Sequence, residues 1–249
     1  MQQSRMNRRT LPSHTGIRVV PKPLAARTMP PLLLDVDGTL VDSVYEHVVA
    51  WREALEEAEI RLPNWKIHRR MGMSGKQFLP ALLREIGQKV SKAEIESIEK
   101  IRRLIFAKKI SEIRILPGAK ELLQFFGKMD APWALAASGD RCQVEELLKG
   151  LNIPSDTPVI TDDDSAAAKP APDVFVLAAQ RLGVSGSDSI VIGDSPRDLL
   201  AAQRMKALGV GLLCGGYAQC ELEHSGAYRI YEDPEDLLEH IEELGFETE

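Results

Sequence analysis

The sequence predicts an α/β fold, in which a doubly wound parallel sheet carries an inserted α-helical block. Three observations favour this fold. Short apolar runs alternate with helical patterns beyond residue 116, which is typical of a parallel sheet flanked by helices. One earlier apolar run, residues 31–37, ends in acidic side chains. Residues 44–114, between that run and the alternating part, have only helical periodicity.

The first strand is expected within residues 31–37, because its leucines form an unbroken apolar run of the kind that buried parallel strands have. Helical periodicity then begins at Val44 and stops before Pro63. A second helix is expected over 77–86. A third is expected over 91–110, because this segment opens with the Ser-x-x-Glu pattern of a capping box.

Beyond the helical block, strand and helix patterns alternate as far as the C-terminal part of the chain. The strands are predicted at 133–137, 158–161, 189–192, 209–213 and 228–231, and the helices at 119–128, 141–149, 172–182, 197–207 and 234–243. We therefore expect a core (31–43 and 115–249), a helical cap (44–114) and a basic flexible tail (1–30). A transit peptide and a translation start at Met29 are the alternatives to a tail.

Composition excludes several classes of protein. No run approaches 18 consecutive apolar residues, which argues against a membrane span, and 44% hydrophobic residues argue against wholesale disorder. The three cysteines form no CxxC pair, so a reducing, cytoplasmic setting is expected. A net charge of -6 with a basic helical block disfavours nucleic acid as a partner and suits a small anion, although ordinary solvated helix faces are the alternative. Monomer and homodimer both stay open.

Polar side chains follow three of the predicted strands, where ligands of open parallel sheets bind. They are Asp35 and Asp37 after the first strand, Ser138 after the second and Asp194 after the strand at 189–192. Because Asp35 and Asp37 are two residues apart, an extended backbone points both to the same side. Two such carboxylates can act as nucleophile and general acid/base, or bind a hard cation. Helix capping or a salt bridge is the structural alternative.

Four segments, in this order, resemble the motifs of the haloacid dehalogenase superfamily. They are residues 35–43 (DVDGTLVDS, similar to DxDGTLxDS), Ser138, residues 169–173 (KPAPD, similar to KPxPD) and residues 193–198 (GDSPRD, similar to GDSxxD). The resemblance covers residues 31–245 and is to the phosphoglycolate phosphatase-like and β-phosphoglucomutase-like branch. That branch has a Rossmann-like core and a small helical cap.

The resemblance implies a Mg²⁺-dependent phosphatase that acts on a small phosphorylated metabolite. Asp35 would attack the phosphorus and form an aspartyl-phosphate, while Asp37 would act as general acid and then as general base. Mg²⁺ would be held by the Asp35 carboxylate, the Asp37 main-chain carbonyl and the Asp194 carboxylate. The remaining phosphoryl oxygens would be bound by Ser138, Gly139 and Lys169.

Other residues are candidates by position. Asp198, one helical turn beyond Asp194, could orient a metal-bound water or Lys169, or it could be an ordinary first-turn helix acid. His47 and Trp51 fit the HxxAW pattern that mutases and many sugar phosphatases share. Four basic residues of the cap are candidates for binding the organic part of the substrate, namely His47, Arg69, Arg70 and Lys76. Their alternatives are a role at the cap hinge for His47 and solvated helix-end charges for the other three.

The reaction type follows from a few positions within the resemblance. Halide-releasing and phosphonate-cleaving members lack the second aspartate, whereas Asp37 is present here. Thr39 and Gly193 favour a phosphatase, and a sugar-phosphate mutase of the β-phosphoglucomutase type is the alternative. A non-enzymatic scaffold is disfavoured, because it would have no physical reason to keep several costly buried charges.

Overall fold

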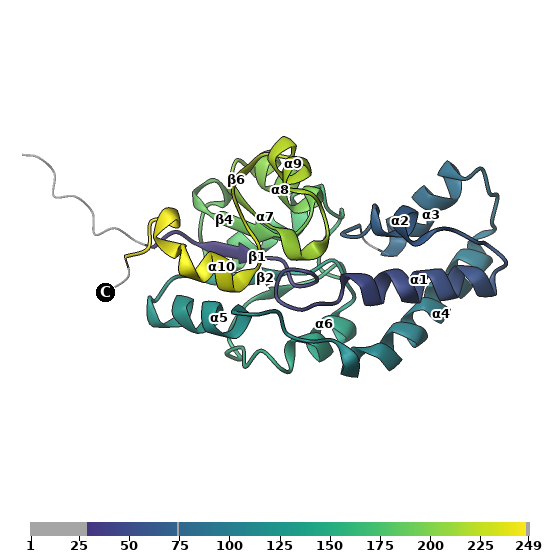
Figure 1. Cartoon of the computed structure of the whole chain (residues 1–249), viewed down its shortest axis with the longest axis horizontal. Coiled ribbons are helices and arrows are strands. Elements are labelled where there is room, and N and C mark those ends of the chain that lie inside the picture. The colour runs from purple at the N-terminus through teal and green to yellow at the C-terminus, as the bar shows by residue number, and fades with distance from the viewer. Residues whose placement is uncertain (1–28, 74, 248–249) are drawn as a thin grey trace, which may run out of the picture.

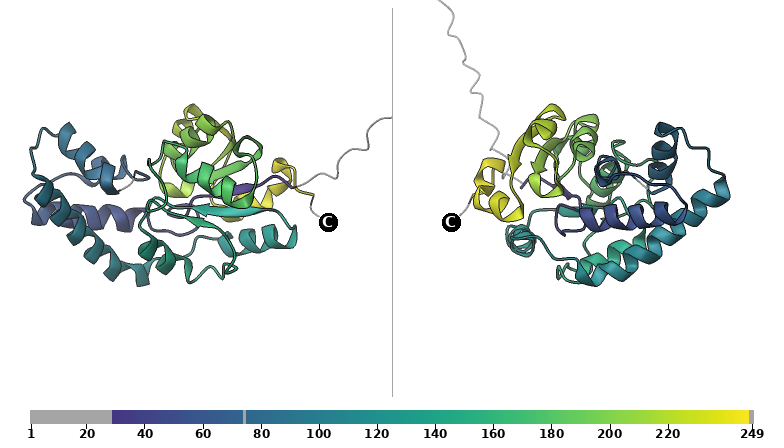
Figure 2. Two further views of the ribbon diagram at one scale, coloured as in Figure 1. Left: turned by 180° about the vertical axis from the view of Figure 1, so that it is seen from behind. Right: turned by 45° about the vertical axis from the view of Figure 1, so that its right-hand side comes forward.

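The computed structural model describes residues 29–73 and 75–247, with the backbone alone at residues 75 and 76. The described part contains a six-stranded sheet of order β3-β2-β1-β4-β5-β6, in which each neighbouring pair is parallel. Helices cover both faces, and further helices project from one end of the sheet (Figures 1 and 2). The predicted doubly wound α/β fold is confirmed. The expected tail lies outside the described residues, apart from residues 29 and 30.

The strands are short, and the central ones are fully apolar. Their bounds are β1 Leu32–Leu34, β2 Trp133–Ala136, β3 Val159–Ile160, β4 Ile190–Gly193, β5 Leu208–Leu212 and β6 Ala227–Tyr231. β1 lies between β2 and β4, and Leu32 is in register with Trp133 and Ile190. Because helices cover both of its faces, β1 consists of three leucines that are all buried, without the polar alternation of a half-exposed strand.

The core helices form one layer on each face of the sheet (Figure 1). Their bounds are α5 Ala119–Lys128, α6 Arg141–Leu148, α7 Asp173–Leu182, α8 Pro196–Met205, α9 Gln219–His224 and α10 Pro234–Glu239, with 3-10 turns at Ile110–Glu112, Gly186–Asp188, Leu213–Gly215 and Ile241–Leu244. Leu32 and Leu34 belong to the same apolar cluster as Phe126 of α5. Leu33 points to the other face and belongs to the cluster of Phe175 on α7.

The helices that project from the sheet, which we call the helical insert, lie in the chain between β1 and β2. They are α1 Val44–Glu57, α2 Asn64–His68, α3 Gly75–Glu85 and α4 Lys92–Lys109. The insert has its own apolar cluster, in which Trp51 stacks on Phe78 with ring centroids 4.2 Å apart. α1 and α4 pack along each other, so the chain leaves the core and returns to it at neighbouring points (Figure 1). There, Val41 and Ile115 form an antiparallel bridge.

Most of the predicted elements are present, with bounds that differ by a few residues. The capping box that starts at Ser91 is confirmed, because Ser91 and Glu94 exchange side-chain and backbone hydrogen bonds. The sequence analysis missed α2 and α9, whose five and six residues are too few to display a helical period. Pro63 ends the preceding periodicity, but it also stands directly before the first turn of α2, where its fixed φ suits a helix start.

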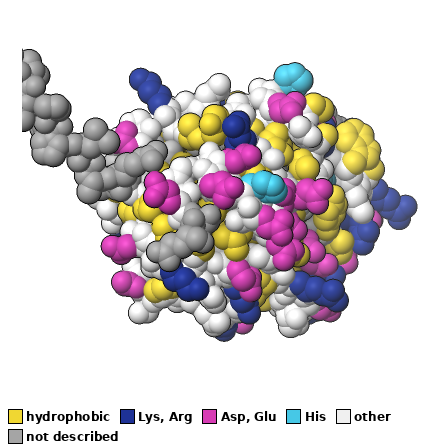
Figure 3. Space-filling model, turned by 60° about the vertical axis from the view of Figure 1, so that its left-hand side comes forward, with side chains coloured by type: hydrophobic (Ala, Val, Ile, Leu, Met, Phe, Trp, Pro, Cys, Tyr) yellow, Lys and Arg dark blue, Asp and Glu magenta, His cyan; other side chains and the backbone are white. Residues whose placement is uncertain are grey.

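One face of the core carries many acidic side chains (Figure 3). Acidic side chains gather on the face at the end of the molecule away from the insert (Figure 3). Among the helices of residues 29–73 and 75–247, none combines the length and the apolar character that crossing a bilayer requires.

Gly118 provides a test of how closely α5 and α10 approach each other. Its φ is 69°, and a Cβ at this position would collide with the backbone of Glu235 at the start of α10. We expect Gly118→Ala to lower the free energy of unfolding by about 2–5 kcal/mol, the combined cost of a left-handed residue and of overpacking. Urea denaturation measures the change.

Gly183 is the matched control, because its φ is 71° and a Cβ there would meet nothing within 4 Å. Gly183→Ala is expected to lower the free energy of unfolding by about 1–2 kcal/mol, because only the strain of a left-handed alanine is added. Equal losses in the two variants would show that the approach of α10 to Gly118 has no energetic consequence.

Candidate active site

The candidate site lies at the carboxyl ends of the three central strands. Asp35 directly follows β1, Ser138 follows β2 and Asp194 follows β4. Since β1 has β2 on one side and β4 on the other, the sheet order brings these three strand ends together. A pocket at this edge is lined by all three residues and by Asp37.

Lys169 is the cation at the centre of the site. It lies in the segment between β3 and α7, and its side chain is only 1% exposed. Its Nζ atom forms an ion pair with Asp35 Oδ1 and lies 2.8 Å from Asp198 Oδ1. It also donates a hydrogen bond of 3.0 Å to the carbonyl oxygen of Ala136 at the end of β2. Lys169 therefore connects the nucleophile candidate, the start of α8 and the neighbouring strand.

Burial governs the protonation of the site. Burial raises the pKa of Asp35 to about 7, although the charge of Lys169 acts in the opposite direction. The pKa of Asp194 is raised well above its usual value by burial and by the charges of Asp198 and Asp35. Burial alone would lower the pKa of Lys169, but the carboxylates of Asp198 and Asp35 outweigh it and raise that pKa. These carboxylates crowd one another, and a further positive charge among them would stabilise their ionised forms.

Asp37 has its own set of partners, which come from the start of the helical insert. Its Oδ1 atom accepts a hydrogen bond of 2.5 Å from the Ser43 hydroxyl and lies 2.9 Å from His47 Nε2. The His47 ring is held by stacking on Phe106, with centroids 3.8 Å apart. Burial would raise the pKa of Asp37, but the interactions with His47 and Ser43 bring it below its usual value. Asp35 and Asp37 therefore have different environments, as two carboxylates with different tasks require.

A cluster of three buried carboxylates fits a divalent cation. Oxygen atoms of Asp35, Asp194 and Asp198 all lie within 4.8 Å of one another. Hard cations such as Mg²⁺ take oxygen ligands of this kind. Gly215 leaves room beside the Asp194 carboxylate, because a Cβ at that position would collide with it. Both carboxylate oxygens of Asp198 are engaged, Oδ1 with Lys169 and Oδ2 with the Ser195 hydroxyl at 2.6 Å. Asp35, by contrast, contacts Lys169 through Oδ1 alone, so Asp35 and Asp194 are the carboxylates best suited to bind the ion.

The helical insert covers the pocket. His47, Trp51 and the loop residues Met71, Gly72 and Met73 line it together with the aspartates. The loop after α2 is held to the core, since the Arg197 guanidinium donates to the carbonyl of Met71 at 3.1 Å. On the same side, Tyr217 donates to the carbonyl of His68 at 3.2 Å, and the His68 ring lies 2.9 Å from the carbonyl of Gly215. In this arrangement the insert closes over the strand ends.

The structure places the other predicted residues as follows. Ser138 donates a hydrogen bond to the carbonyl of Gly72 at 3.4 Å and so touches the insert, and Gly139 follows it in the same loop. Arg69 pairs with Glu221 at 2.5 Å, and Arg70 forms an ion pair with Glu85. Neither arginine lines the pocket, so the predicted substrate contact by Arg69 and Arg70 gains no support and stays a prediction. The Lys76 side chain lies outside the described residues.

Arg102 of α4 is a pocket residue that the sequence analysis missed. It is buried on the same helix face as Ile98 and Phe106. The sequence contains a signal for it, because Arg102 stands four residues after Ile98 and four before Phe106, within an apolar helix face. Charged residues are rarely buried on such a face unless they have a partner or a function.

A family comparison identifies the chain. The family model of the haloacid dehalogenase-like hydrolases matches residues 32–206. The chain belongs to this family. Membership confirms the resemblance found in the sequence and the prediction of an enzyme. Haloacid dehalogenase-like hydrolases typically use a divalent metal, and the buried aspartates described above could bind one.

Several haloacid dehalogenase-like hydrolases are similar to this chain. Hexitol phosphatase A of Escherichia coli K12 is 31% identical, with 68% of this chain and 76% of that protein covered. The β-phosphoglucomutase of Bacillus subtilis is 28% identical, with 74% of this chain and 84% of that protein covered. The crystal structure of a hydrolase from Pseudomonas syringae is 42% identical, covers 86% of this chain and 99% of that chain, and has a TM-score of 0.83.

The carboxylate cluster predicts stabilisation by a divalent cation. We expect excess MgCl₂ to raise the melting temperature, because a ligand at about 100 times its Kd stabilises the folded state by about 2.7 kcal/mol. Asp194→Asn should remove most of the shift. Asp156→Asn, which changes an exposed aspartate in the loop between α6 and β3, should retain it. An unchanged melting temperature of the unmutated protein in MgCl₂ would contradict a cation site in this cluster.

Proposed function

We propose that this protein is a Mg²⁺-dependent phosphatase that hydrolyses a small phosphomonoester through an aspartyl-phosphate. The observation that carries the proposal is the placement of Asp35, which is buried, lines the pocket and is bound to Lys169 through Oδ1. That contact leaves Oδ2 for attack on a phosphorus atom. A carboxylate held in this way by a buried ammonium group is an oriented nucleophile.

Charge compensation at the phosphoryl group is the second part of the proposal. Asp35 and Asp194, with the main-chain carbonyl of Asp37, would hold Mg²⁺, which when bound would neutralise charge on the phosphoryl oxygens. Lys169 lies against Asp35, which supports a role for its ammonium group in binding the incoming oxygens in exchange for one of its present contacts. We expect the Ser138 hydroxyl and the Gly139 backbone, which follow β2, to bind the others. Asp198 would be a positioning residue, because its Oδ1 atom lies 2.8 Å from Lys169 Nζ and helps to hold that ammonium group in place.

Asp37 would move the proton. As Asp35 attacks, the bond between phosphorus and the leaving oxygen would break, and that oxygen would take a proton from the Asp37 carboxyl group. Asp37 then accepts a proton from a water molecule, which attacks the aspartyl-phosphate, so that inorganic phosphate leaves and the Asp35 carboxylate is restored. Ser43 and His47 support this role because both bond to Asp37 Oδ1.

The helical insert would act as a cap that excludes bulk water during transfer. We propose a division of the chain into this cap (44–114) and a catalytic core (31–43 and 115–249). The contacts of Arg197 and Tyr217 with the loop after α2 support a closed position over the pocket. Exclusion of bulk water strengthens the electrostatic interactions within the pocket.

The relatives are consistent with a phosphatase and leave one competing activity. Besides hexitol phosphatase A, a phosphoglycolate phosphatase of Shigella boydii is 28% identical, with 82% of this chain and 89% of that protein covered. The similarity to a β-phosphoglucomutase, and the contact of His47 with Asp37, favour a sugar-phosphate mutase as the alternative.

The two aspartates give a test of the proposed mechanism. Asp35→Asn should abolish phosphate release from both p-nitrophenyl phosphate and an alkyl phosphate, because no aspartyl-phosphate can form. Asp37→Asn should slow the release of the alkyl alcohol by about 10²–10⁴-fold, the usual contribution of a general acid. It should slow the release of nitrophenol much less, since that leaving group needs no proton. Single-turnover release of the two alcohols is the measurement.

Two results would contradict the proposal. Full activity in Asp35→Asn would show that Asp35 is not the nucleophile. If the protein instead moved phosphate between positions of a sugar phosphate and released almost no inorganic phosphate, it would be a mutase and not a phosphatase. Asp156→Asn is again the matched control and should keep the rate of the unmutated protein.

A further inference from the structure

A buried arginine faces the pocket from the helical insert. Arg102 lies on α4, and its residue is only 8% exposed. It lines the same pocket as Asp35 and Asp37, although it comes from the insert and they come from the end of β1. A ligand bound by Asp35 in this pocket would have the Arg102 guanidinium group within the same cavity.

The contacts of Arg102 are neutral. Its Nη1 atom donates a hydrogen bond of 3.1 Å to the side-chain oxygen of Gln143 on α6. Its guanidinium carbon lies 5.3 Å from the centroid of a Trp51 ring and 6.0 Å from that of Phe106. Its Nε atom is buried without a hydrogen-bond partner. Within residues 29–73 and 75–247, no carboxylate forms a salt bridge with it.

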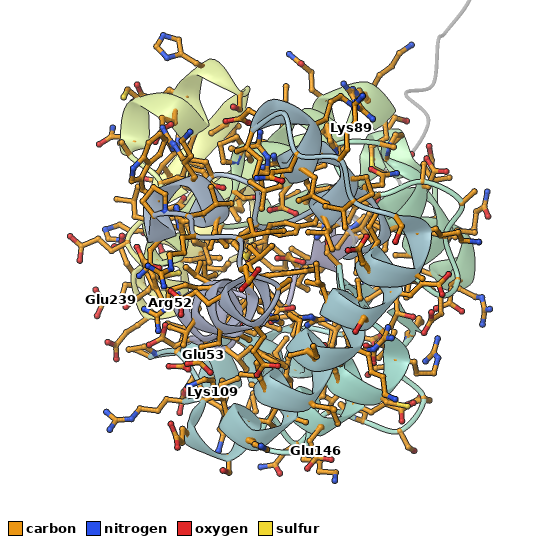
Figure 4. The ribbon with its side chains drawn as sticks, turned by 90° about the vertical axis from the view of Figure 1, so that its right-hand side faces the viewer. Arg52, Glu53, Lys89, Lys109, Glu146 and Glu239 are labelled. Carbon is orange, nitrogen blue, oxygen red and sulfur yellow. The ribbon has the colours of Figure 1, made fainter. Side chains whose placement is uncertain are left out.

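Other basic side chains of the insert are arranged differently. Arg69 and Arg70 each have a glutamate partner. Arg52 pairs with Glu53 at 3.7 Å on the outside of α1, where both are labelled in Figure 4. Each of these pairs has at least one member that is more than a third exposed, so solvent screens it. Arg102 is the buried arginine of the described insert, and it lacks such a partner.

A buried guanidinium without a carboxylate partner costs free energy, and an anionic ligand offsets that cost. Burial lowers the pKa of Arg102, and the attraction of the Asp140, Asp37 and Glu99 carboxylates opposes this shift without reversing it. An arginine remains charged even so. Gln143 occupies one nitrogen of a group that has five N–H donors, so hydrogen-bonding capacity remains for a ligand.

We propose that Arg102 binds a carboxylate on the alcohol portion of the substrate, so that the preferred substrates are phosphate esters of small hydroxy acids. This inference rests on the proposed phosphatase function and names its substrate class. A planar guanidinium matches a planar carboxylate, and the two aromatic rings beside it keep water away from the pair. A neutral sugar or polyol could accept hydrogen bonds from Arg102 but would leave its charge uncompensated.

The test uses two phosphate esters that differ in one group. Phosphoglycolate carries a carboxylate where 2-hydroxyethyl phosphate carries a neutral hydroxymethyl group. We expect the unmutated protein to favour phosphoglycolate in kcat/KM. Arg102→Met should lower kcat/KM for phosphoglycolate by about 10- to 100-fold, mainly through KM, as loss of a charge-assisted hydrogen bond does. It should change the neutral ester by less than about threefold.

Two further variants separate binding from structure. Arg102→Lys keeps the charge and should restore part of the preference. Arg103→Met, the matched control, removes the neighbouring, exposed arginine of the same helix and should leave both esters unchanged. If both Arg102 variants fail to fold, the ratio of kcat/KM for the two esters in the unmutated protein still tests whether the site prefers a carboxylate.

The outcomes distinguish the inference from the proposed function. An equal loss for both esters in Arg102→Met, or no preference in the unmutated protein, would overturn the carboxylate site while phosphate release continued. Absence of phosphate release from both esters and from p-nitrophenyl phosphate would instead overturn the phosphatase function, and the substrate class with it.

Discussion

One buried ammonium group holds the site together. Asp35, Asp194 and Asp198 bring three carboxylates to within 4.8 Å of one another, away from solvent, where they would repel each other strongly. Lys169 lies between two of them and compensates part of their charge. Removing one partner of such a buried pair leaves an uncompensated charge, which costs about 3–5 kcal/mol. The segment between β3 and α7 must therefore deliver Lys169 to one point, and the hydrogen bond to Ala136 helps to fix it there.

The site contains two buried cationic side chains whose partners differ in charge. Lys169, on the core side, is balanced by carboxylates of the protein itself. Arg102, on the side of the insert, is held by an amide oxygen and by aromatic rings. In the proposed function, the core would supply the charges that bind the reacting group, and the insert would supply the charge that binds the remainder of the ligand. Chemistry and selectivity would then belong to different parts of the chain, which meet where the insert lies over the strand ends.

The sequence was sufficient to predict the sheet, the insert and the groups at the strand ends. Apolar runs such as residues 32–34 are unambiguous when both faces of a strand are buried, and Asp35 and Asp194 follow directly from where the strands stop. It was insufficient where contacts join residues distant in the chain. The basic loop residues Arg69 and Arg70 have the composition of a ligand site, but the sequence did not reveal their glutamate partners at positions 221 and 85, and their predicted substrate contact stays a prediction. Arg102 interrupts an apolar helix face, which is a local signal, but the hydrogen bond that holds it there joins it to Gln143, 41 residues away, and could not be predicted.

The connection between core and insert has an evolutionary consequence. The two linking segments form a hydrogen-bonded antiparallel pair, in which Asp42 donates to the carbonyl of Arg114 at 2.8 Å and Leu116 donates to that of Leu40 at 3.0 Å. The ends of the insert are thus already side by side before any of its helices is specified. Closing a longer or shorter segment across such a junction costs little extra entropy. A lineage could therefore exchange, lengthen or trim this module, and so explore new ligands, while the catalytic sheet is inherited unchanged.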